Sequence, residues 1–300
     1  MIKENNQEQT EMKLKKREAA ALRIRESFPH LTCPVCQEKL AVNETSLICA
    51  NRHQFDIAKN GSLHLLKKSV KTNYTKELFQ ARRYLMDEVG FFYPVTDQIV
   101  QLVQNEQGLK ILDAGCGEGT HLSYILRKCE GNDFTGIGMD LAKDGIQTAA
   151  SHDESALWIT ADLAKAPVEN DSIDIVLNIL SPANYREFSR LLTKRGRVIK
   201  VVPRTGYLKE LRQHYFDEEY TNEETTAAFY DQFDVVDKIT VQHTQQLDHA
   251  AIAALVRMTP LSWRADQDKV QSFLDKKMAE MTIDVDILIG VKKVELEVSE

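Results

Sequence analysis

Four metal-ligand side chains at short spacings constrain this chain more than any other feature. Cys33 and Cys36 form a Cys-x2-Cys pair, and Cys49 and His53 form a Cys-x3-His pair after a gap of twelve residues. Thiolates and a neutral imidazole suit tetrahedral zinc, and two such pairs separated by a strand and a turn can close around one ion. The spacing therefore predicts a zinc ribbon held by Cys33, Cys36, Cys49 and His53.

The compartment bears on the choice between zinc and a disulfide. The N-terminus is polar and its first apolar cluster lies between charges, so no window resembles a secretory signal. No run of 18 apolar residues occurs, so we expect no membrane span. We expect a reducing, cytoplasmic location, where disulfides are rare. This favours zinc over a disulfide pair or ordinary buried thiols. His30 and His64 are rival fourth ligands, but neither has a partner as close as Cys49 is to His53.

Charge is distributed unevenly along the chain. Residues 1–83 hold 16 Lys and Arg against 9 Asp and Glu, whereas residues 84–300 hold 22 against 36. A basic N-terminal third beside an acidic remainder fits a phosphate-seeking module attached to an acidic body. The net charge of −7 therefore does not exclude a nucleic-acid partner. Solvated surface lysines are the alternative explanation.

Composition and apolar spacing divide the chain into four segments. Residues 1–27 are charged and Ala-rich, and we expect a mobile extension whose helical part has too narrow an apolar face to dock strongly. The zinc ribbon follows at 28–66, and a basic linker with a helical connector follows at 67–95. The remainder, 96–300, is long enough for one large domain.

A strand, a glycine turn and a helix follow one another from residue 110 to residue 126. Gly115, Gly117 and Gly119 let the turn tighten and let a ligand approach the backbone without a Cβ in the way. A dinucleotide fingerprint requires glycine or alanine where this chain has Thr120. S-adenosylmethionine sites use the related acid-x-G-x-G-x-G form, and Asp113 supplies the acid. The segment therefore favours S-adenosylmethionine over a dinucleotide.

Further strands with acidic ends support this interpretation. Strands are predicted at 134–139, 156–160, 172–178 and 197–202, with helical segments between them. Such alternation predicts an α/β, Rossmann-like fold, a doubly wound and mostly parallel sheet with ligands at its carboxyl edge. Asp140 follows the second strand, where it can accept the ribose hydroxyls. Asp162 follows the third, where it can accept the adenine amino group. Each aspartate taken singly reads equally well as a helix cap.

Four separated motifs now match a known family in order. They are the Cys-x2-Cys-x12-Cys-x3-His ribbon continuing to Lys59, the Gln80–Arg83 segment, the Gly115–Gly119 turn and the Met258–Arg264 segment. From about Phe28 to the C-terminus the chain resembles the 23S rRNA (guanine-N1)-methyltransferases of the RlmA type. The resemblance implies a class I S-adenosylmethionine-dependent methyltransferase domain at 96–300 behind a zinc ribbon. It also implies methylation of a guanine in a 23S rRNA hairpin that lines the peptide exit tunnel, a homodimer and, in some members, a link to macrolide response.

The same resemblance assigns individual residues. Cys33, Cys36, Cys49 and His53 would hold Zn²⁺, and Phe92, His121, Leu122 and Tyr207 fall where the family contacts S-adenosylmethionine. Two of these depart from the family pattern. The family often has tyrosine where this chain has Phe92, and some relatives have histidine where it has Tyr207. Both changes keep a flat ring that can pack on the cofactor, but they change its hydrogen bonds.

The implied reaction is in-line attack by guanine N1 on the sulfonium methyl group. N1 lies on the Watson–Crick edge, so the base has to be unpaired or flipped. Positioning can supply roughly 7–11 kcal/mol of the barrier, and a general base a smaller share. The sequence identifies no catalytic base. Residues 178–182, Asn-Ile-Leu-Ser-Pro, lie where many such enzymes touch the acceptor base, but they also read as a helix-opening Ser-Pro turn.

Basic side chains offer contacts to RNA. We expect the ribbon to present Lys39, Arg52 and Lys59. Arg82 and Arg83 either reach phosphates or lie along an amphipathic helix with their charged ends in water.

Two other functions remain as alternatives. A small-molecule methyltransferase, such as a quinone C-methylating enzyme, would share the cofactor sheet but has no evident need for a basic ribbon. A non-catalytic RNA-binding adaptor would not need Asp113, Asp140 and Asp162 at strand ends. The rRNA enzyme accounts for both halves of the chain, although the sequence does not give the guanine that is methylated.

Overall fold

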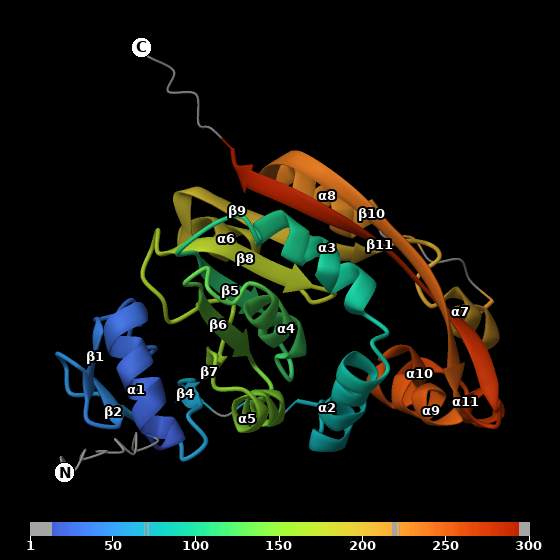
Figure 1. Cartoon of the computed structure of the whole chain (residues 1–300), viewed down its shortest axis with the longest axis horizontal. Coiled ribbons are helices and arrows are strands. Elements are labelled where there is room, and N and C mark those ends of the chain that lie inside the picture. The colour runs from blue at the N-terminus through green and yellow to red at the C-terminus, as the bar shows by residue number, and fades with distance from the viewer. Residues whose placement is uncertain (1–13, 69, 71, 218–220, 222, 294–300) are drawn as a thin grey trace, which may run out of the picture.

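The computed structural model describes residues 14–68, 70, 72–217, 221 and 223–293. An eight-stranded sheet runs through the molecule in the order β10-β11-β9-β8-β5-β6-β7-β4 (Figure 1). Its strands are β4 (Leu63–Leu65), β5 (Lys110–Ala114), β6 (Thr135–Asp140), β7 (Ala156–Ala161), β8 (Ile173–Ile179), β9 (Leu192–Pro203), β10 (Phe233–Asp248) and β11 (Met278–Lys292). The strands from β4 to β9 pair in parallel, whereas β10 and β11 are antiparallel. The predicted mostly parallel sheet is confirmed.

Both faces of the sheet are buried. In β5, Ile111 belongs to the core on one face and Leu112 to the core on the other, as the two-residue period of a strand requires. Helices α3 (Tyr93–Val103), α4 (Thr120–Lys128), α5 (Lys143–His152), α7 (Lys209–Tyr215) and α9 (His249–Met258) contribute to the first core. Helices α1 (Lys16–Ser27), α6 (Tyr185–Leu191) and α8 (Glu223–Gln232) contribute to the second. The sheet is therefore covered on two sides, as parallel sheets are.

The strand order reverses between β5 and β8. From β5 the chain moves outward through β6 to β7, and it then returns to place β8 and β9 on the other side of β5. Ligands of open α/β sheets bind beyond the carboxyl ends of the strands at this switch point. The loops after Ala114 and after Ile179 therefore bound the expected site.

The N-terminal segment differs from the expected mobile extension. Residues 1–13 lie outside the described residues, but α1 is docked on the edge of the sheet beside β1 (Leu40–Asn43) and β7. Its narrow apolar face, which includes Ala20 and Ile24, is buried. The Lys16 ammonium donates to the Ser151 carbonyl at 2.9 Å. Small side chains allow the helix to approach its neighbours closely. A narrow apolar face is therefore enough to dock α1, although its composition predicted weak docking.

The ribbon and the main domain share an edge. Strands β1, β2 (Ser46–Cys49) and β3 (Gln54–Asp56) form an antiparallel sheet of their own. The chain then enters β4, which pairs in parallel with β7 of the large sheet. The end of the segment expected as ribbon, 28–66, is therefore a strand of the main domain.

A short segment of the main domain holds the ribbon in place. Leu31 forms an isolated bridge with Val168, and the Glu169 amide donates to the His30 carbonyl at 2.9 Å. The Glu169 carboxylate also lies 2.8 Å from the His30 ring and 3.4 Å from the Lys39 ammonium. The ribbon is therefore joined to the main domain by backbone and charged contacts together.

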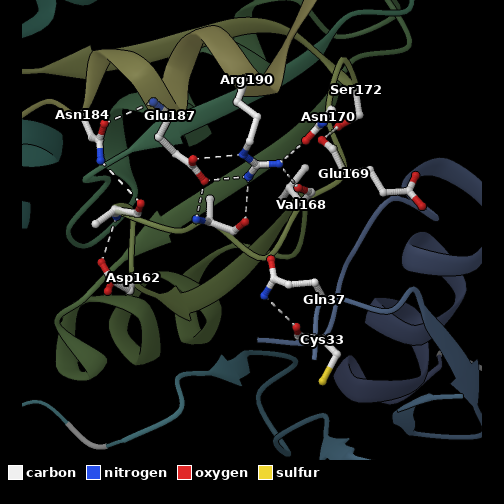
Figure 2. Close-up of polar contacts among 12 residues, drawn as sticks. Cys33, Gln37, Asp162, Val168, Glu169, Asn170, Ser172, Asn184, Glu187 and Arg190 are labelled. Carbon is white, nitrogen blue, oxygen red and sulfur yellow. Dashed lines mark hydrogen bonds and ion pairs between the residues drawn. The ribbon is translucent and has the colours of Figure 1, made fainter. Parts of the chain in front are cut away.

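Arg190 of α6 fixes that segment from behind. Figure 2 shows its guanidinium between the Glu187 carboxylate and the 166–170 loop. It donates to the Val168 carbonyl at 2.8 Å and to the Asn170 side chain at 2.7 Å. Glu187 in turn accepts the Ala166 amide at 2.7 Å. Because these hydrogen bonds hold the loop on its inner side, its outer side is a stable platform for the ribbon.

The predicted connector at 67–95 is part of the main domain's wall. Helix α2 (Lys76–Arg83) packs on α5 and α9, and one π-helical turn, η1 (Tyr84–Glu88), leads into α3. Strands β10 and β11 pair with each other and are connected by α9, α10 (Leu261–Arg264) and α11 (Gln267–Leu274). These helices lie at the opposite end of the molecule from the ribbon (Figure 1). Across the described ranges, no helix has the length and apolar character needed to span a bilayer.

Candidate active site and metal centre

The four predicted metal ligands come together in the ribbon. Their ligand atoms all lie within 4.8 Å of one another. Cys36 Sγ is 3.7 Å from Cys49 Sγ, and His53 Nδ1 is 3.4 Å from Cys49 Sγ and 3.5 Å from Cys33 Sγ. Zn–S bonds of about 2.3 Å in a tetrahedron give edges of roughly 3.8 Å, so the cluster has the size of a zinc site. His30 and His64 are not among the clustered residues.

The surroundings of the cluster fit a structural ion. The Cys33 and Cys49 side chains are buried, and a hydrogen bond with the Asn51 side chain lowers the pKa of Cys36 to about 6. Burial raises the pKa of Cys33 and so favours the neutral thiol. A bound metal ion would reverse this preference, because a thiol that coordinates a metal ion is deprotonated. Four protein ligands leave no open position for a substrate.

The glycine turn after β5 has the shape that its sequence predicts. Gly115, Gly117 and Gly119 have φ values of +87°, +59° and +80°, which favour glycine. A Cβ on Gly115 would lie 2.0 Å from the Ser181 hydroxyl in the loop after β8. A side chain at this position would therefore close the space between the two loops of the switch point. The open cradle is what a bound cofactor requires.

Asp140, at the end of β6, is tied to this turn. Its carboxylate accepts the Gly117 amide at 2.9 Å and the Ala142 amide at 2.7 Å, one on each oxygen. Each oxygen keeps a second lone pair, so two ribose hydroxyls can still donate to it. Burial raises the pKa of Asp140.

A buried group of charges lies beneath the turn. The Glu118 side chain is 0% exposed, and its carboxylate lies 3.1 Å from Arg82 Nε of helix α2. Burial raises the pKa of Glu118 and raises that of Asp113 to about 7, while the Arg82 charge opposes both shifts. Burial lowers the pKa of Arg82, but the nearby carboxylates outweigh it and hold the pKa above its usual value. Helix α2 is thereby fixed to the glycine turn.

We expect Arg82→Met to destabilise the fold by about 3–5 kcal/mol, because it leaves the Glu118 carboxylate buried without a partner. The loss should grow as the pH rises, since an unpaired Glu118 must keep its proton in the folded state. Urea unfolding at pH 6 and pH 8 measures both effects. The matched control is Arg83→Met, which removes a half-buried pair with Asp87 and should cost below about 1 kcal/mol. Equal losses for the two variants would contradict this assignment.

A cavity of about 630 Å³ opens beside the turn. Its walls come from α2, the β8–α6 loop, β9 and the segment around α10, and they include the predicted cofactor residues Phe92, His121 and Tyr207. The remaining lining residues are Tyr74, Leu78, Arg82, Leu180, Ser181, Pro182, Ala183, Tyr185, Lys200, Val201, Val202, Pro203, Arg212, Ala228, Met258, Thr259, Pro260, Leu261 and Arg264. Four of the described lining residues are Lys or Arg, and no described lining residue is Asp or Glu.

His121 is held as a neutral ring in this wall. Its Nδ1 lies 2.9 Å from the Thr96 hydroxyl, and its ring meets the edge of Phe92 with centroids 6.0 Å apart. Burial, with the Arg82 charge as a smaller cause, lowers the pKa of His121 to about 3. His121 therefore contributes shape and hydrogen bonding at physiological pH and no charge.

The cavity wall contains three of the ten predicted cofactor residues. Asp113, the three glycines and Asp140 lie in or beside the adjoining turn, whereas Leu122 and Asp162 lie elsewhere. Leu122 is fully buried in the main core. Asp162 is exposed after β7, where its carboxylate accepts the Ala164 amide at 2.9 Å. Figure 2 shows this turn beside Asn184. Their roles toward the cofactor stay predictions.

Lys200, a buried polar residue that the sequence did not predict as functional, also lines the cavity. Lys200 of β9 is 3% exposed, and its ammonium donates to Asn178 Oδ1 and, at 2.6 Å, to the Ser181 carbonyl. The Asn178 amide nitrogen donates to the Ala114 carbonyl at 2.7 Å, which joins the ends of β5 and β8. Burial lowers the pKa of Lys200 to about 8. The signal in the sequence was a single lysine within the apolar strand 198–202.

The Asn-Ile-Leu-Ser-Pro segment does not open a helix at its Ser-Pro pair. Helix α6 begins at Tyr185 and is capped by Asn184, whose side chain accepts the Glu187 amide. Residues 180–183 instead line the cavity, with Leu180 at a φ of +50°. The segment is therefore a wall of the cavity, and its contact with an acceptor base stays a prediction.

Comparisons with known proteins match this arrangement. Residues 31–72 match the family model for the N-terminal part of RlmA, and residues 111–202 match the model of a methyltransferase domain. A Bacillus subtilis protein named as a candidate 23S rRNA (guanine-N(1)-)-methyltransferase, YxjB, is 41% identical over 276 residues, which cover 88% of this chain and 98% of that protein. The chain belongs to the 23S rRNA (guanine-N1)-methyltransferase family.

Two further relatives define the scope of the match. The 23S rRNA (guanine(748)-N(1))-methyltransferase of Streptomyces fradiae is 29% identical, over 84% of this chain and 91% of that protein. A phthiotriol/phenolphthiotriol dimycocerosates methyltransferase of Mycobacterium ulcerans is 32% identical, but over only 34% of this chain and 36% of its own length. The rRNA methyltransferase family thus accounts for nearly the whole chain, ribbon included. The enzyme is S-adenosylmethionine-dependent, and its ribbon suits Zn²⁺.

Proposed function

We propose that this enzyme methylates N1 of a guanine in a 23S rRNA hairpin that lines the peptide exit tunnel. The observation that carries the proposal is the composition of the cavity wall. The cavity adjoins the glycine turn, and its described wall holds Arg212 and Arg264, the Arg82 that pairs with the buried Glu118, and Lys200, but no carboxylate, in a chain whose net charge is −7. Such a wall suits a polyanion better than a neutral lipid or quinone.

The cofactor-binding residues form part of the proposal. Asp140 would accept the ribose hydroxyls beside the Gly117 amide. Asp113 lies beneath the turn, and Phe92, His121 and Tyr207 line the cavity next to it. Leu122 would contribute to the cofactor site from the main core, and Asp162 from the exposed turn after β7. The positive φ values at Gly115, Gly117 and Gly119, with the clash that a Cβ would cause, support close approach of a ligand to this backbone.

We expect binding of S-adenosylmethionine, which carries a net positive charge, to strengthen about tenfold from pH 6 to pH 8, because Asp113 with a pKa of about 7 then ionises. The folded-state pKa lies above the unfolded value of 3.8, so the same carboxyl group contributes stability at low pH that is lost as the pH rises to 7. Calorimetric titration at both pH values measures the first effect. Asp113→Asn should flatten the pH dependence, and an unchanged slope in that variant would assign the proton to another group.

Lys200 would take the N1 proton. Bound S-adenosylmethionine supplies an electrophilic methyl group on a sulfonium. A neutral Lys200 amine has two N–H donors, and Asn178 Oδ1 and the Ser181 carbonyl accept both. Its lone pair is then left for the cavity that Lys200 lines. With a pKa of about 8, the amine is partly neutral at physiological pH, as a general base must be.

The ribbon would recognise RNA outside the cavity. Arg52 and Lys59 are exposed on it, whereas Lys39 also pairs with Glu169. Zinc would fold this module and take no part in methyl transfer. Action in the cytoplasm, where ribosomal RNA is made and assembled in bacteria, belongs to the same proposal, as does a homodimer that cups the hairpin between two ribbons. Light scattering of the purified protein tests the homodimer.

Primer extension on 23S rRNA from a strain that lacks this gene tests the proposed substrate. A methyl group on N1 blocks pairing and halts the polymerase, so one stop should disappear in the deletion strain and return with the gene. An unchanged stop pattern would reject 23S rRNA as the substrate and would favour the small-molecule alternative. Absence of any heat on titration with S-adenosylmethionine would favour the adaptor.

A further inference from the structure

An exposed aromatic pair lies at the mouth of the cavity. Trp263 is 43% exposed and Tyr74 is 42% exposed, and their rings meet edge to face with centroids 5.4 Å apart. Among the described residues only one other aromatic side chain, Tyr230, is exposed to this degree. Two of three such rings in direct contact, one of them in the cavity wall, form a defined surface rather than scattered apolar exposure.

The pair is anchored to the cofactor side of the site. Tyr74 stacks on Phe79 with centroids 6.1 Å apart, and Phe79 is buried in a small core under α2. A Cβ built on Gly117 would lie 3.3 Å from the Phe79 ring. A row of three rings thus runs from the glycine turn to the surface. Whatever stacks at its outer end is held at a fixed place relative to the cofactor.

Trp263 is presented by a firmly held backbone. Its neighbour Ser262 is buried and lies 3.4 Å, oxygen to oxygen, from the Tyr215 hydroxyl. The Trp263 amide donates to the Pro260 carbonyl at 3.2 Å. Exposure of the indole is therefore not a consequence of a loose segment. An apolar ring on a rigid support, turned to solvent, is typical of a stacking platform.

The charges at the mouth select the partner. Arg264, the residue after Trp263, lines the cavity, as does Arg212. An aromatic pair, one ring of which shares the cavity wall with two guanidinium groups and with no described carboxylate, matches an unpaired nucleotide, whose base stacks while its phosphate binds a cation. A guanine that enters the cavity leaves its stacked neighbours, and a protein ring has to replace the lost contact.

We propose that Tyr74 and Trp263 stack on a nucleobase next to the guanine that is methylated, and that they hold the RNA strand open at the cavity. This inference rests on the proposed function and adds the residues that recognise the flanking nucleotide. Stacking on protein rings changes affinity by about 5- to 150-fold per base on alanine substitution. The loss in a Trp263→Ala variant should appear in KM for RNA and not in the dissociation constant of S-adenosylmethionine.

A cycle that combines a protein substitution with an abasic site in the RNA tests the proposed stacking. The wild type and Trp263→Ala are assayed on unmodified 23S rRNA fragments that carry the target hairpin, with the base on either side of the guanine intact or abasic. We expect the abasic substitution on one side to raise KM about 5- to 150-fold in the wild type and hardly at all in the variant. Trp263→Phe should restore the difference. Tyr230→Ala, an exposed ring outside the described cavity wall, should behave as wild type.

Fluorescence gives a second readout. The chain has two tryptophans, and Trp158 is buried with its indole N–H donating to the Asp153 carbonyl. Quenching by the RNA fragment should therefore come from Trp263 and be lost in Trp263→Phe. If the wild type methylates RNA but abasic and alanine losses add independently, the aromatic pair is rejected and the proposed function stands. If the wild type methylates no RNA, both fall.

Discussion

Replacing Lys200 with methionine is expected to lower kcat about 100- to 10,000-fold, the range that a positioned general base contributes. The wild-type kcat/KM should rise with pH and level off above about 8, where the amine is neutral, because burial lowers the pKa of Lys200 to that value. With S-adenosylmethionine saturating at every pH, so that the Asp113 effect does not contribute, the variant should lose this rise. Stopped-time assays of tritiated methyl transfer to 23S rRNA between pH 6 and pH 9.5 measure both.

Controls separate a lost base from a damaged fold. Lys194→Met removes an exposed lysine from the same strand and should keep the wild-type pH profile. Calorimetry with S-adenosylmethionine checks that the cofactor site survives in the Lys200 variants. Lys200→Ala should regain part of its rate with added methylamine, which a packing defect would not. A Lys200→Met enzyme with wild-type kcat and an unchanged pH profile would remove Lys200 from the mechanism.

The second large effect concerns the metal. Cys36→Ser should release stoichiometric zinc and unfold the ribbon, because zinc contributes about 10–16 kcal/mol to the folding of small zinc modules. RNA affinity should fall with it, whereas S-adenosylmethionine affinity should persist because the glycine turn lies in the α/β domain. On the full chain, elemental analysis measures the zinc, limited proteolysis measures the unfolding, and calorimetry with RNA and with S-adenosylmethionine measures the two affinities.

Cys129→Ser is the matched control for the metal. Cys129 is a buried thiol at the end of α4, outside the cluster, and its variant should keep one zinc ion per chain. Zinc retained at full stoichiometry in Cys36→Ser would contradict the ligand assignment. So would an equal loss of metal in the two variants.

The sequence predicts those parts of the site whose residues lie close together along the chain. The zinc ligands lie within 21 residues, and the glycine turn within five, so spacing alone defines both. The strand ends that carry Asp113 and Asp140 follow from alternation of apolar segments, since parallel strands bring their carboxyl ends to one edge.

Contacts between residues that lie far apart in the sequence could not be predicted. Lys200 gains its partner Asn178 only through the pairing of β8 with β9, which places the two residues opposite each other. Arg82 appeared to be a surface cation until α2 packed against the glycine turn and buried Glu118. Docking of α1 depends on the fit of small side chains such as Ala20, which no apolar count measures. Each case needed a partner that lies far away in the sequence.

The most direct measurement is mass spectrometry of nucleosides from unmodified 23S rRNA after incubation with the purified enzyme and S-adenosylmethionine. We expect one 1-methylguanosine per 23S rRNA from the wild type and from the Lys194→Met control, and almost none from Lys200→Met. Methylation at another guanine atom or on another base, or none at all by a zinc-loaded enzyme that binds S-adenosylmethionine, would contradict this expectation.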